Sequence, residues 1–508
     1  MNTAVLLAKA ARVHSERPAL KFGDRRWTYA ELDAWTGSVA AGLLGLGLRR
    51  GDRVVLWMRN RPELVALFFG CLKAGLCAVP VNMRLHPSEV AYIVENSGAR
   101  AIAADETFTP EIPPPGVVVF DAGHLPAGPS PLAPASDVDE EAAWLFYTSG
   151  TTGRPKGAVL THRNLLAATM NCLADIHSFQ PEEVVLHVAP LTHGSGMYML
   201  PAIARGATNL VSHHASFDPP AVFELIERER VTAIAFLAPT MIVKLLNDPS
   251  RSRFDLSSIA FSCYGGGPMY VEHIKQTVTA MGRIWVQIYG QGETPMTATY
   301  LRAADHRWDD PDSERRLGSV GIPRTDVEVR ILDTADNAVE TGDVGEICVR
   351  AETVMRGYWG DADATAAALR GGWLHTGDLG YMDDASYVFL VDRAKDMIIS
   401  AGNNIYAREV EEALLTHPDV LEAAVIGVPD EYWGESVHAV VVRRTGGGEV
   451  TSGELIEHVR GRLASYKKPR TVEFVDELPK SAYGKVLKRE LRERVGTGPG
   501  KPGPYDGT

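Results

Sequence analysis

Strand-like and helix-like hydrophobic patterns alternate along the first hundred residues of the chain. Residues 25–47 predict an amphipathic helix that begins at about Thr28 and is capped there, and residues 52–58 (DRVVLWM) form an apolar run typical of a buried strand. Residues 62–82 predict a second helix and a second strand. Repeated strand and helix units with short turns favour an α/β domain with a mostly parallel sheet.

The pattern changes further along the chain. Prolines and small residues without periodicity fill residues 110–136, which predicts a surface connection. Alternating strands and turns over residues 327–359 predict a small β-rich subdomain, and mixed helices and strands follow from about Asp396. We therefore predict the α/β class, with a large N-terminal α/β domain of several subdomains, one of them β-rich, and a small α+β C-terminal domain. The Gly/Pro-rich residues 496–508 are expected to be disordered.

The segment Tyr147–Gly157 (YTSGTTGRPKG) gathers glycines and hydrogen-bond donors, and an apolar strand precedes it. Such a loop lets backbone N–H and hydroxyl groups surround an oxyanion, while Lys156 adds a positive charge. A surface connection without a ligand is the alternative. A Walker A loop is disfavoured, because it needs glycine before the lysine and Ser or Thr after it, whereas Pro155 and Gly157 flank Lys156.

Three further segments place candidate binding groups after strands or in turns. Residues 262–269 (SCYGGGPM) and 286–296 (VQIYGQGETPM) each follow an apolar run, and loops at the carboxyl ends of strands bind ligands in open α/β sheets. Asp378 follows a tight turn at Thr376 and Gly377. Its carboxylate can accept two hydrogen bonds from vicinal hydroxyls, although an aspartate in a turn is usually only a turn former.

Composition limits the classes of protein to which the chain can belong. The 508 residues are 45% apolar and 23% charged, as in ordinary globular proteins. The net charge of −13 argues against a nucleic-acid partner, and no window of about eighteen apolar residues predicts a membrane span. The N-terminus predicts an amphipathic helix rather than a signal peptide. Five widely spaced cysteines predict reduced core residues and a cytoplasmic protein, and a homodimer stays open as an alternative to a monomer.

The Tyr147–Gly157 segment resembles the signature loop of the adenylate-forming enzymes, which include acyl-CoA synthetases, luciferases and nonribosomal peptide synthetase adenylation domains. The other motifs occur in the family's order along nearly the whole chain. The resemblance implies a ligase that uses ATP and Mg²⁺ to turn a carboxylic acid into an acyl adenylate. A thiol, expected to be that of coenzyme A, then takes the acyl group.

By this resemblance the phosphate loop, the two later loops and the turn at Asp378 surround the nucleotide. The residues implied are Thr148, Ser149, Gly150, Thr151, Thr152 and Lys156 for phosphate, Gly266, Gly267, Tyr289, Gly290, Gln291, Gly292 and Thr294 for adenine and acyl group, and Asp378 and Arg393 for ribose or phosphate. Glu293 is implied as the Mg²⁺ ligand, because Mg²⁺ prefers hard oxygen donors. His193, which is more often structural at a strand end, is implied to line the passage where carboxylate and thiol meet.

The resemblance also implies a domain division. The large domain covers residues 1–391, the hinge residues 392–395, and the small, mobile domain residues 396–495, with Lys395 at the hinge. Lys485 is implied to offset charge during adenylation, and Gly402 to border the pantetheine passage after the small domain rotates. Basic residues at 443–444 and 466–470 either hold the phosphates of coenzyme A or form a solvated face.

Two positions depart from what related enzymes carry. Gly292 occupies the place of a Thr or Ser whose hydroxyl donates to the α-phosphate, so Thr294, a water, a backbone N–H or the added room must compensate. We hypothesise that Gly292 and the glycines at 265–267 leave a wide pocket for a bulky or cyclic acid, against the alternative that they only satisfy backbone geometry. An α-amino acid is disfavoured, since His193 and its neighbours replace the expected aspartate. Transfer to a carrier protein, or a weakened ligand-binding homologue, stay as alternatives.

Overall fold

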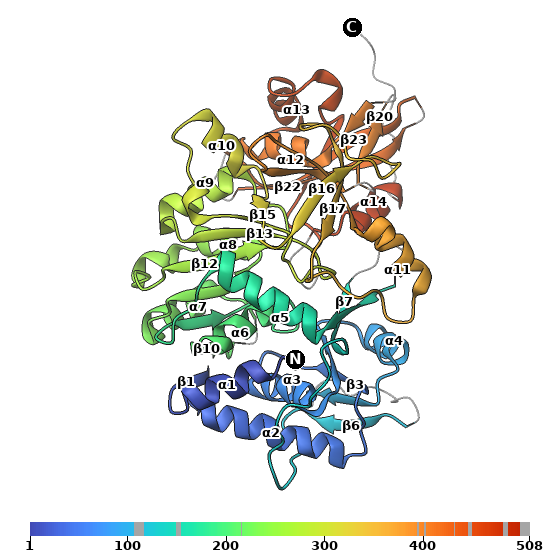
Figure 1. Ribbon diagram of the computed structural model, residues 1–508. Coiled ribbons are helices and arrows are strands. Elements are labelled where there is room, and N and C mark those ends of the chain that lie inside the picture. The colour runs from blue at the N-terminus through green and yellow to red at the C-terminus, as the bar shows by residue number, and fades with distance from the viewer. Residues whose placement is uncertain are drawn as a thin grey trace.

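The computed structural model contains two large, mostly parallel sheets, a small antiparallel sheet and a C-terminal α+β unit (Figure 1). It describes residues 1–105, 116–148, 154–214, 216–393, 396–400, 403–430, 432–444, 450–480 and 486–497, with the side chains of residues 393, 496 and 497 excepted. The tail residues 498–508 lie outside the described residues. This architecture confirms the predicted fold class.

The first large sheet has six strands in the order β6-β5-β3-β4-β7-β8, and its only antiparallel pair among the described strands is β7 with β8. Its strands are β3 (Arg53–Trp57), β4 (Cys77–Val81), β5 (Ala101–Ala104), β6 (Val118–Asp121), β7 (Ala142–Thr148) and β8 (Lys156–Thr161). The predicted mostly parallel sheet is thereby confirmed. The β7–β8 hairpin sets Thr148 opposite Lys156, so the glycine-rich loop connects two paired ends.

The second large sheet has nine strands in the order β15-β14-β13-β12-β11-β9-β10-β1-β2. They are β1 (Pro18–Phe22), β2 (Arg25–Thr28), β9 (Val184–His187), β10 (Thr208–Val211), β11 (Ala233–Leu237), β12 (Phe261–Gly265), β13 (Trp285–Tyr289), β14 (Thr299–Leu301) and β15 (Ile322–Pro323). Strand β1 pairs in parallel with β10, with Leu20 opposite Asn209. The first strands of the chain therefore complete a sheet built mostly from residues 184–323.

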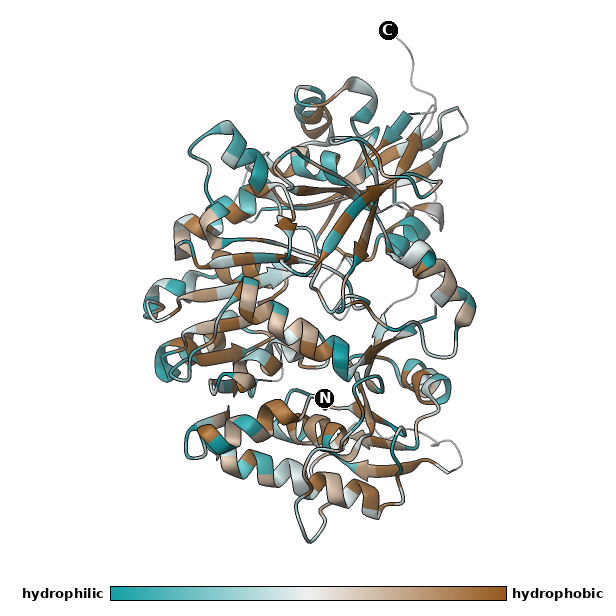
Figure 2. Cartoon of the chain, in the orientation of Figure 1, coloured by the Kyte–Doolittle hydropathy of each residue, from teal (hydrophilic) through white to brown (hydrophobic). Residues whose placement is uncertain are grey.

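Helices cover both sheets, and Figure 2 shows hydrophilic and hydrophobic residues alternating along the helical ribbons. They are α1 (Val5–Val13), α2 (Tyr29–Gly45), α3 (Pro62–Ala74), α4 (Pro87–Ser97), α5 (His162–Asn171), α6 (Gly194–Ala204), α7 (Pro219–Glu229), α8 (Pro239–Asn247), α9 (Val271–Met281), α10 (Pro311–Leu317) and α11 (Ala362–Ala368), with short turns η1 (Cys172–Ile176), η2 (Pro249–Arg253), η3 (Ala303–Asp305) and η4 (Arg370–Gly372). Helix α2 begins as predicted, because Thr28 and Glu31 form a capping box. Asp218 caps the start of α7, since its side chain accepts from Ala221 N (3.2 Å).

The β-rich subdomain is a four-stranded antiparallel sheet. It consists of β16 (Glu328–Leu332), β17 (Gly345–Arg350), β18 (Leu374–Met382) and β19 (Val388–Arg393). The C-terminal unit that follows contains β20 (Ile398–Ser400), β21 (Asn403–Ile405), α12 (Ala407–Leu415), β22 (Val420–Asp430), β23 (Gly434–Arg443), α13 (Ser452–Arg460), η5 (Ser465–Lys467), β24 (Thr471–Val475) and α14 (Lys488–Thr497). The first unit confirms the predicted β-rich subdomain, and the second confirms the predicted mixture of helices and strands after about Asp396.

A buried polar link ties the C-terminal unit to the rest of the chain. The Tyr270 hydroxyl, just before α9, donates to Glu411 Oε2 of α12 (3.0 Å). Lys488 Nζ of α14 lies 2.8 Å from Glu411 Oε1, so the carboxylate is satisfied from both sides. A buried charge of this kind needs such partners to be tolerated.

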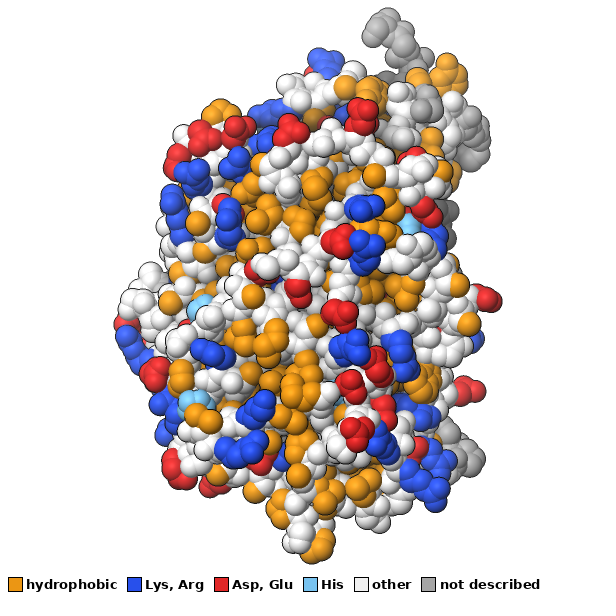
Figure 3. Space-filling model, viewed as in Figure 1, with side chains coloured by type: hydrophobic (Ala, Val, Ile, Leu, Met, Phe, Trp, Pro, Cys, Tyr) orange, Lys and Arg blue, Asp and Glu red, His pale blue; other side chains and the backbone are white. Residues whose placement is uncertain are grey.

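Basic and acidic side chains are interspersed over the face shown in Figure 3. Among the side chains described on this face, basic groups therefore do not gather into one broad patch. The five cysteines are all reduced and buried, as predicted. Among the described residues, no helix combines the length and the apolar character that crossing a bilayer requires.

Candidate functional site

A buried carboxylate lies beside Thr148, where the glycine-rich loop between β7 and β8 begins. Glu293 is 6% exposed, and its Oε1 accepts from the hydroxyls of Thr148 (3.2 Å) and Tyr358 (2.8 Å). Burial and the charge of Glu293 raise the pKa of the Tyr358 hydroxyl, so that this group stays protonated and donates. Among the described residues, both contacts go to Oε1, which leaves Oε2 for a metal ion.

Tyr358 also lies against the cation of the loop, since Lys156 Nζ is 5.2 Å from the centre of its ring. One tyrosine therefore contacts both the implied Mg²⁺ ligand and the implied phosphate-binding lysine. Sequence reasoning missed Tyr358, because no spacing signal connects it to Glu293, 65 residues earlier. The implied residues Ser149, Gly150, Thr151 and Thr152 lie outside the described residues.

A second buried carboxylate gathers the residues implied for adenine and ribose. Asp378 is 5% exposed, and its Oδ2 accepts from the Tyr289 hydroxyl (2.9 Å) and from Gln291 Nε2 (2.8 Å). Gln291 Nε2 also donates to the carbonyl of Thr376 (2.7 Å). The loop after β13 and the turn in β18, which are far apart in sequence, are thereby joined.

The backbone conformation at position 290 requires glycine. Gly290 has φ +153°, and a Cβ there would lie 2.8 Å from the backbone of Met296. The close return of the chain after Gly290 is what brings Gln291 to Asp378.

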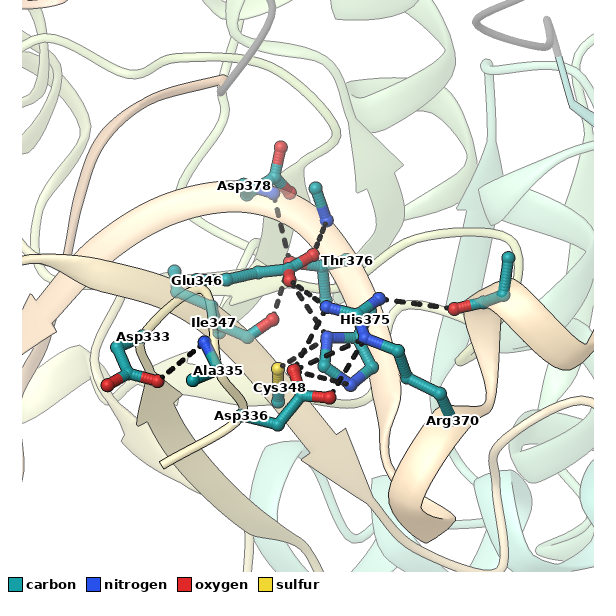
Figure 4. Close-up of polar contacts among 12 residues, drawn as sticks. Asp333, Ala335, Asp336, Glu346, Ile347, Cys348, Arg370, His375, Thr376 and Asp378 are labelled. Carbon is teal, nitrogen blue, oxygen red and sulfur yellow. Dashed lines mark hydrogen bonds and ion pairs between the residues drawn. The ribbon is translucent and has the colours of Figure 1, made fainter. Parts of the chain in front are cut away.

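Figure 4 shows how side chains of β17 and β18 support the turn at Asp378. Glu346 Oε1 accepts from the backbone N–H of Gly377 (2.8 Å), and Glu346 Oε2 contacts His375 Nδ1 (2.8 Å). The Thr376 hydroxyl donates to the carbonyl of Ile347 (2.7 Å) and accepts from Asp378 N (3.1 Å). Glu346 thus fixes the backbone from which the Asp378 carboxylate projects, a role that no sequence signal indicated.

The same neighbourhood contains metal-ligand types, since Glu346, Cys348 and His375 present donor atoms close together. Arg370 already forms ion pairs with Glu346 Oε2 (3.1 Å) and with Asp336 (3.1 Å). The guanidinium takes the negative charge that a cation would otherwise neutralise, and Cys348 Sγ lies 3.3 Å from His375 Nδ1. This arrangement favours a hydrogen-bonded support over a metal centre.

His193 lies at the start of α6, next to the β7–β8 hairpin. Its ring centre is 5.0 Å from that of Phe146 in β7, and burial lowers its pKa to about 4. His193 is therefore neutral near pH 7. A Cβ at the adjacent Gly194 would lie 2.8 Å from Met296 Cε, so the helix start, β7 and the loop after β13 meet here.

The glycines do not provide the room that we hypothesised at two of the four positions. A Cβ at Gly265 would lie 2.4 Å from the carbonyl oxygen of Ile288, and one at Gly292 would lie 2.5 Å from the Phe146 ring and 2.7 Å from Thr148 Cγ2. The backbone-geometry alternative is correct for Gly265, and the space beside Gly292 is filled by the chain itself. Among these four, only Gly267 could take a Cβ at ordinary contact distance without strain, since its nearest neighbour would be Pro239 at 3.8 Å.

Gly266 has φ +76°, a backbone conformation that favours glycine, and a Cβ there would lie 3.4 Å from Phe236.

Thr294 does not replace the hydroxyl missing at Gly292 in this structure. Its Oγ1 accepts from Gln291 N (3.1 Å) and donates to the Gln291 carbonyl (3.4 Å), within its own turn. The remaining candidates for the hydrogen-bond donor that replaces the family's Thr or Ser hydroxyl are a water and a backbone N–H.

The remaining implied residues belong to the end of β19 and the C-terminal unit. Arg393 pairs with Asp378 across β18 and β19, but its side chain, like Lys395, Gly402 and Lys485, lies outside the described residues. The basic groups of the C-terminal unit are partly engaged within it, which favours a structural contribution: Arg443 over Phe474, Lys467 with Glu409, and Arg470 over Trp433.

Matches to known proteins cover nearly the whole chain. The family model described as AMP-binding enzyme matches residues 7–359, and its C-terminal domain model matches residues 409–485. A feruloyl-CoA synthase from Amycolatopsis is 39% identical, over 96% of this chain and 98% of the relative. A fatty acid–[acyl-carrier-protein] ligase from Streptomyces coeruleorubidus is 35% identical, over 94% of this chain and 93% of the relative.

Among solved structures, the o-succinylbenzoate CoA synthetase of Bacillus subtilis, in complex with its acyl-adenylate intermediate, superposes with a TM-score of 0.85. The two proteins are 32% identical, and the match covers 96% of this chain and 97% of the other. Because the first family model alone matches well over half of the residues, the chain belongs to the AMP-binding enzyme family of the adenylate-forming superfamily.

Proposed function

We propose that the protein is an AMP-forming ligase that joins an aromatic or other cyclic carboxylic acid to coenzyme A, with ATP and Mg²⁺ as cosubstrate and cofactor. The observation that carries the proposal is the convergence of three distant segments on two buried carboxylates, Glu293 and Asp378. Membership of the family supports the reaction class, an acyl adenylate followed by a CoA thioester. The finer claim about the acid draws on relatives that are named for aromatic acids.

The described residues can orient the nucleotide and the metal in this reaction. Mg²⁺, when bound, supplies positive charge to phosphate oxygens. Thr148 and Tyr358 hold Glu293 in one orientation, and Tyr289 and Gln291 do the same for Asp378. The proposal includes four assignments that the family resemblance implies. Asp378 binds the ribose and the glycine-rich loop binds phosphate. Residues 392–395 form the hinge, and Lys485 is catalytic. Neutral His193, half-buried beside Phe146, provides an uncharged wall next to the reacting carboxyl.

Two alternatives differ in acceptor or in activity. Transfer to a carrier protein is favoured by one observation, the 35% identity to a ligase that is named for an acyl carrier protein. A weakened binding homologue was motivated by Gly292 alone, and the space beside this residue is occupied by Phe146 and Thr148. Because neighbouring side chains fill the space at Gly292, this glycine does not by itself favour a loss of catalytic activity.

The direct test measures pyrophosphate release with ATP and Mg²⁺ across acids of matched size. We expect aryl acids to exceed linear acids of equal carbon number in kcat/KM by at least about tenfold, and product to accumulate as CoA thioester. Parallel reactions contain coenzyme A, a phosphopantetheinylated carrier protein or neither. Faster turnover of linear acids would refute the aromatic assignment, and thioester on the carrier alone would replace coenzyme A as acceptor.

Tyr358→Phe should raise the Mg²⁺ concentration needed for half-maximal pyrophosphate release by roughly tenfold, because a hydrogen bond to a charged group contributes about 1.5 kcal/mol. The phenyl ring keeps its place over Lys156, so only the bond to Glu293 is removed. Tyr147→Phe is the matched control, since that hydroxyl, next to the same loop, donates to Asn96 (2.7 Å) instead. An unchanged Mg²⁺ titration for Tyr358→Phe would mean that Tyr358 does not position the metal ligand.

Gly292→Thr introduces the type of residue that the family usually carries at this position, and we expect it to lower the catalytic activity of this enzyme. We expect Gly292→Thr to lower kcat/KM by about tenfold or more, because its Cβ would overlap Phe146 and Thr148. Adding Phe146→Ala should return part of the lost activity by opening that space. Gly453→Thr serves as control, since nothing lies within 4 Å of a Cβ there. Higher activity of the single variant Gly292→Thr would contradict the packing argument.

A further inference from the structure

Strand β18 departs from regular sheet pairing at the turn that carries Asp378. Its register against β17 shifts between Glu346 and Cys348, so that residues 376–378 of β18 face the single residue Ile347. Extra residues of this kind form a β-bulge, which bends a strand and re-aims its side chains. Bulges are frequent beside active sites, and this one determines the direction in which the Asp378 carboxylate projects.

Side chains connect this bulge to β17. Gly377 N donates to Glu346 Oε1 (2.8 Å), and the Thr376 hydroxyl donates to the carbonyl of Ile347 (2.7 Å). Gly377 has φ +69°, and a Cβ there would meet nothing within 4 Å, so glycine is required by the backbone conformation rather than by a lack of space. Because Glu346 holds the central N–H of the bulge, the position of its carboxylate sets the shape of the bulge.

Glu346 is in turn held by two donors on its other oxygen. His375 Nδ1 lies 2.8 Å from Glu346 Oε2, and Arg370 Nη2 lies 3.1 Å from the same oxygen (Figure 4). The guanidinium also pairs with Asp336 (3.1 Å) and so bridges two carboxylates. Hydrogen bonds between charged groups are stronger than neutral ones. The Arg370–Glu346 pair therefore fixes the carboxylate that holds the bulge.

Asp378 is thus constrained from both ends. Tyr289 and Gln291 hold its carboxylate by hydrogen bonds, and the bulge holds its backbone. Hydrogen bonds weaken steeply when donor and acceptor are displaced or misaligned. A shift of the bulge would therefore weaken the hydrogen bonds that Asp378 makes to a ligand.

We propose that Glu346 and Arg370 are positioning residues that set the selectivity of the enzyme for the ribose of ATP. The inference rests on the proposed function, in which Asp378 binds the ribose hydroxyls, and it goes one step further. Preference for a nucleotide that carries both hydroxyls depends on two side chains that act through the bulge and through Asp378.

The experiment measures the dissociation constants of ATP and 2′,3′-dideoxy-ATP with Mg²⁺ by isothermal titration calorimetry, without any acid. We expect the protein to bind ATP at least about tenfold more tightly, because a site built around a hydroxyl rejects the analogue that lacks it. Glu346→Ala should weaken ATP binding by about tenfold and leave binding of the dideoxy nucleotide within about twofold. The ratio of the two dissociation constants therefore falls toward one.

Glu328→Ala is the matched control, since it also removes a carboxylate that pairs with an arginine of the same sheet. Glu328 Oε2 contacts Arg350 (2.6 Å) between β16 and β17, outside the bulge. This variant should leave the ratio unchanged. If Glu346→Ala lowers the affinity for both nucleotides equally, Glu346 is only structural and the inference is overturned.

Asp378→Ala separates this inference from the proposed function. If this variant retains the preference for ATP, Asp378 does not bind the ribose, and the ribose assignment fails together with the inference. If Asp378→Ala abolishes the preference while Glu346→Ala and Arg370→Met retain it, the ribose assignment holds and the inference alone fails. An enzyme that activates no acid would refute the proposed reaction, and the nucleotide ratios would still decide the inference.

Two further variants cover the case in which Glu346→Ala does not fold. Arg370→Met changes a side chain that is 41% exposed, and it should lower the ratio by about threefold, because Glu346 loses its charged partner. Glu346→Gln keeps an oxygen that accepts from Gly377 N and should retain part of the ratio. In turnover, Arg370→Met should raise KM for ATP and leave kcat within about twofold, since the ribose is held alike in the ground and transition states. A fall in kcat at unchanged KM, with an unchanged nucleotide ratio, would overturn the positioning role of Arg370.

Discussion

Two buried carboxylates, Glu293 and Asp378, govern how the segments around the site come together. A buried charge is tolerated only where donors reach it, and the donors for these two come from β7, from the loop after β13 and from Tyr358 near the end of the β-rich subdomain. The hydrogen bonds that offset the desolvation cost of each buried carboxylate also fix its orientation. Folding stability and the geometry needed for nucleotide chemistry therefore depend on the same hydrogen bonds.

Local sequence signals predicted the local parts of this arrangement. The capped start of α2 at Thr28 and the apolar strand β7 before the glycine-rich loop both depend on residues close in sequence. Partners distant in sequence were not predictable in this way. Strand β1 joins β10 near residue 209, and Tyr358 reaches Glu293 across 65 residues, because these pairings are decided by burial in three dimensions.

Gly292 illustrates a limit of inference from residue type. A missing side chain in a motif suggests empty space when the motif is considered alone. The structure fills that space with the Phe146 ring and the Thr148 methyl group, two residues on β7 that no pattern connected to position 292. Since interiors are packed to a nearly constant density, a small residue at one position is commonly matched by a large neighbour from another segment. The bulky-substrate hypothesis therefore loses its support from Gly265 and Gly292.

Substrate preference must then follow from the chemistry of the pocket walls rather than from the room that these glycines leave. His193, which our proposal places beside the reacting carboxyl, is neutral and lies against Phe146, so the wall at this position is uncharged. A rigid ring loses less rotational freedom on binding than a flexible chain of similar length, which favours the aromatic acid that we propose.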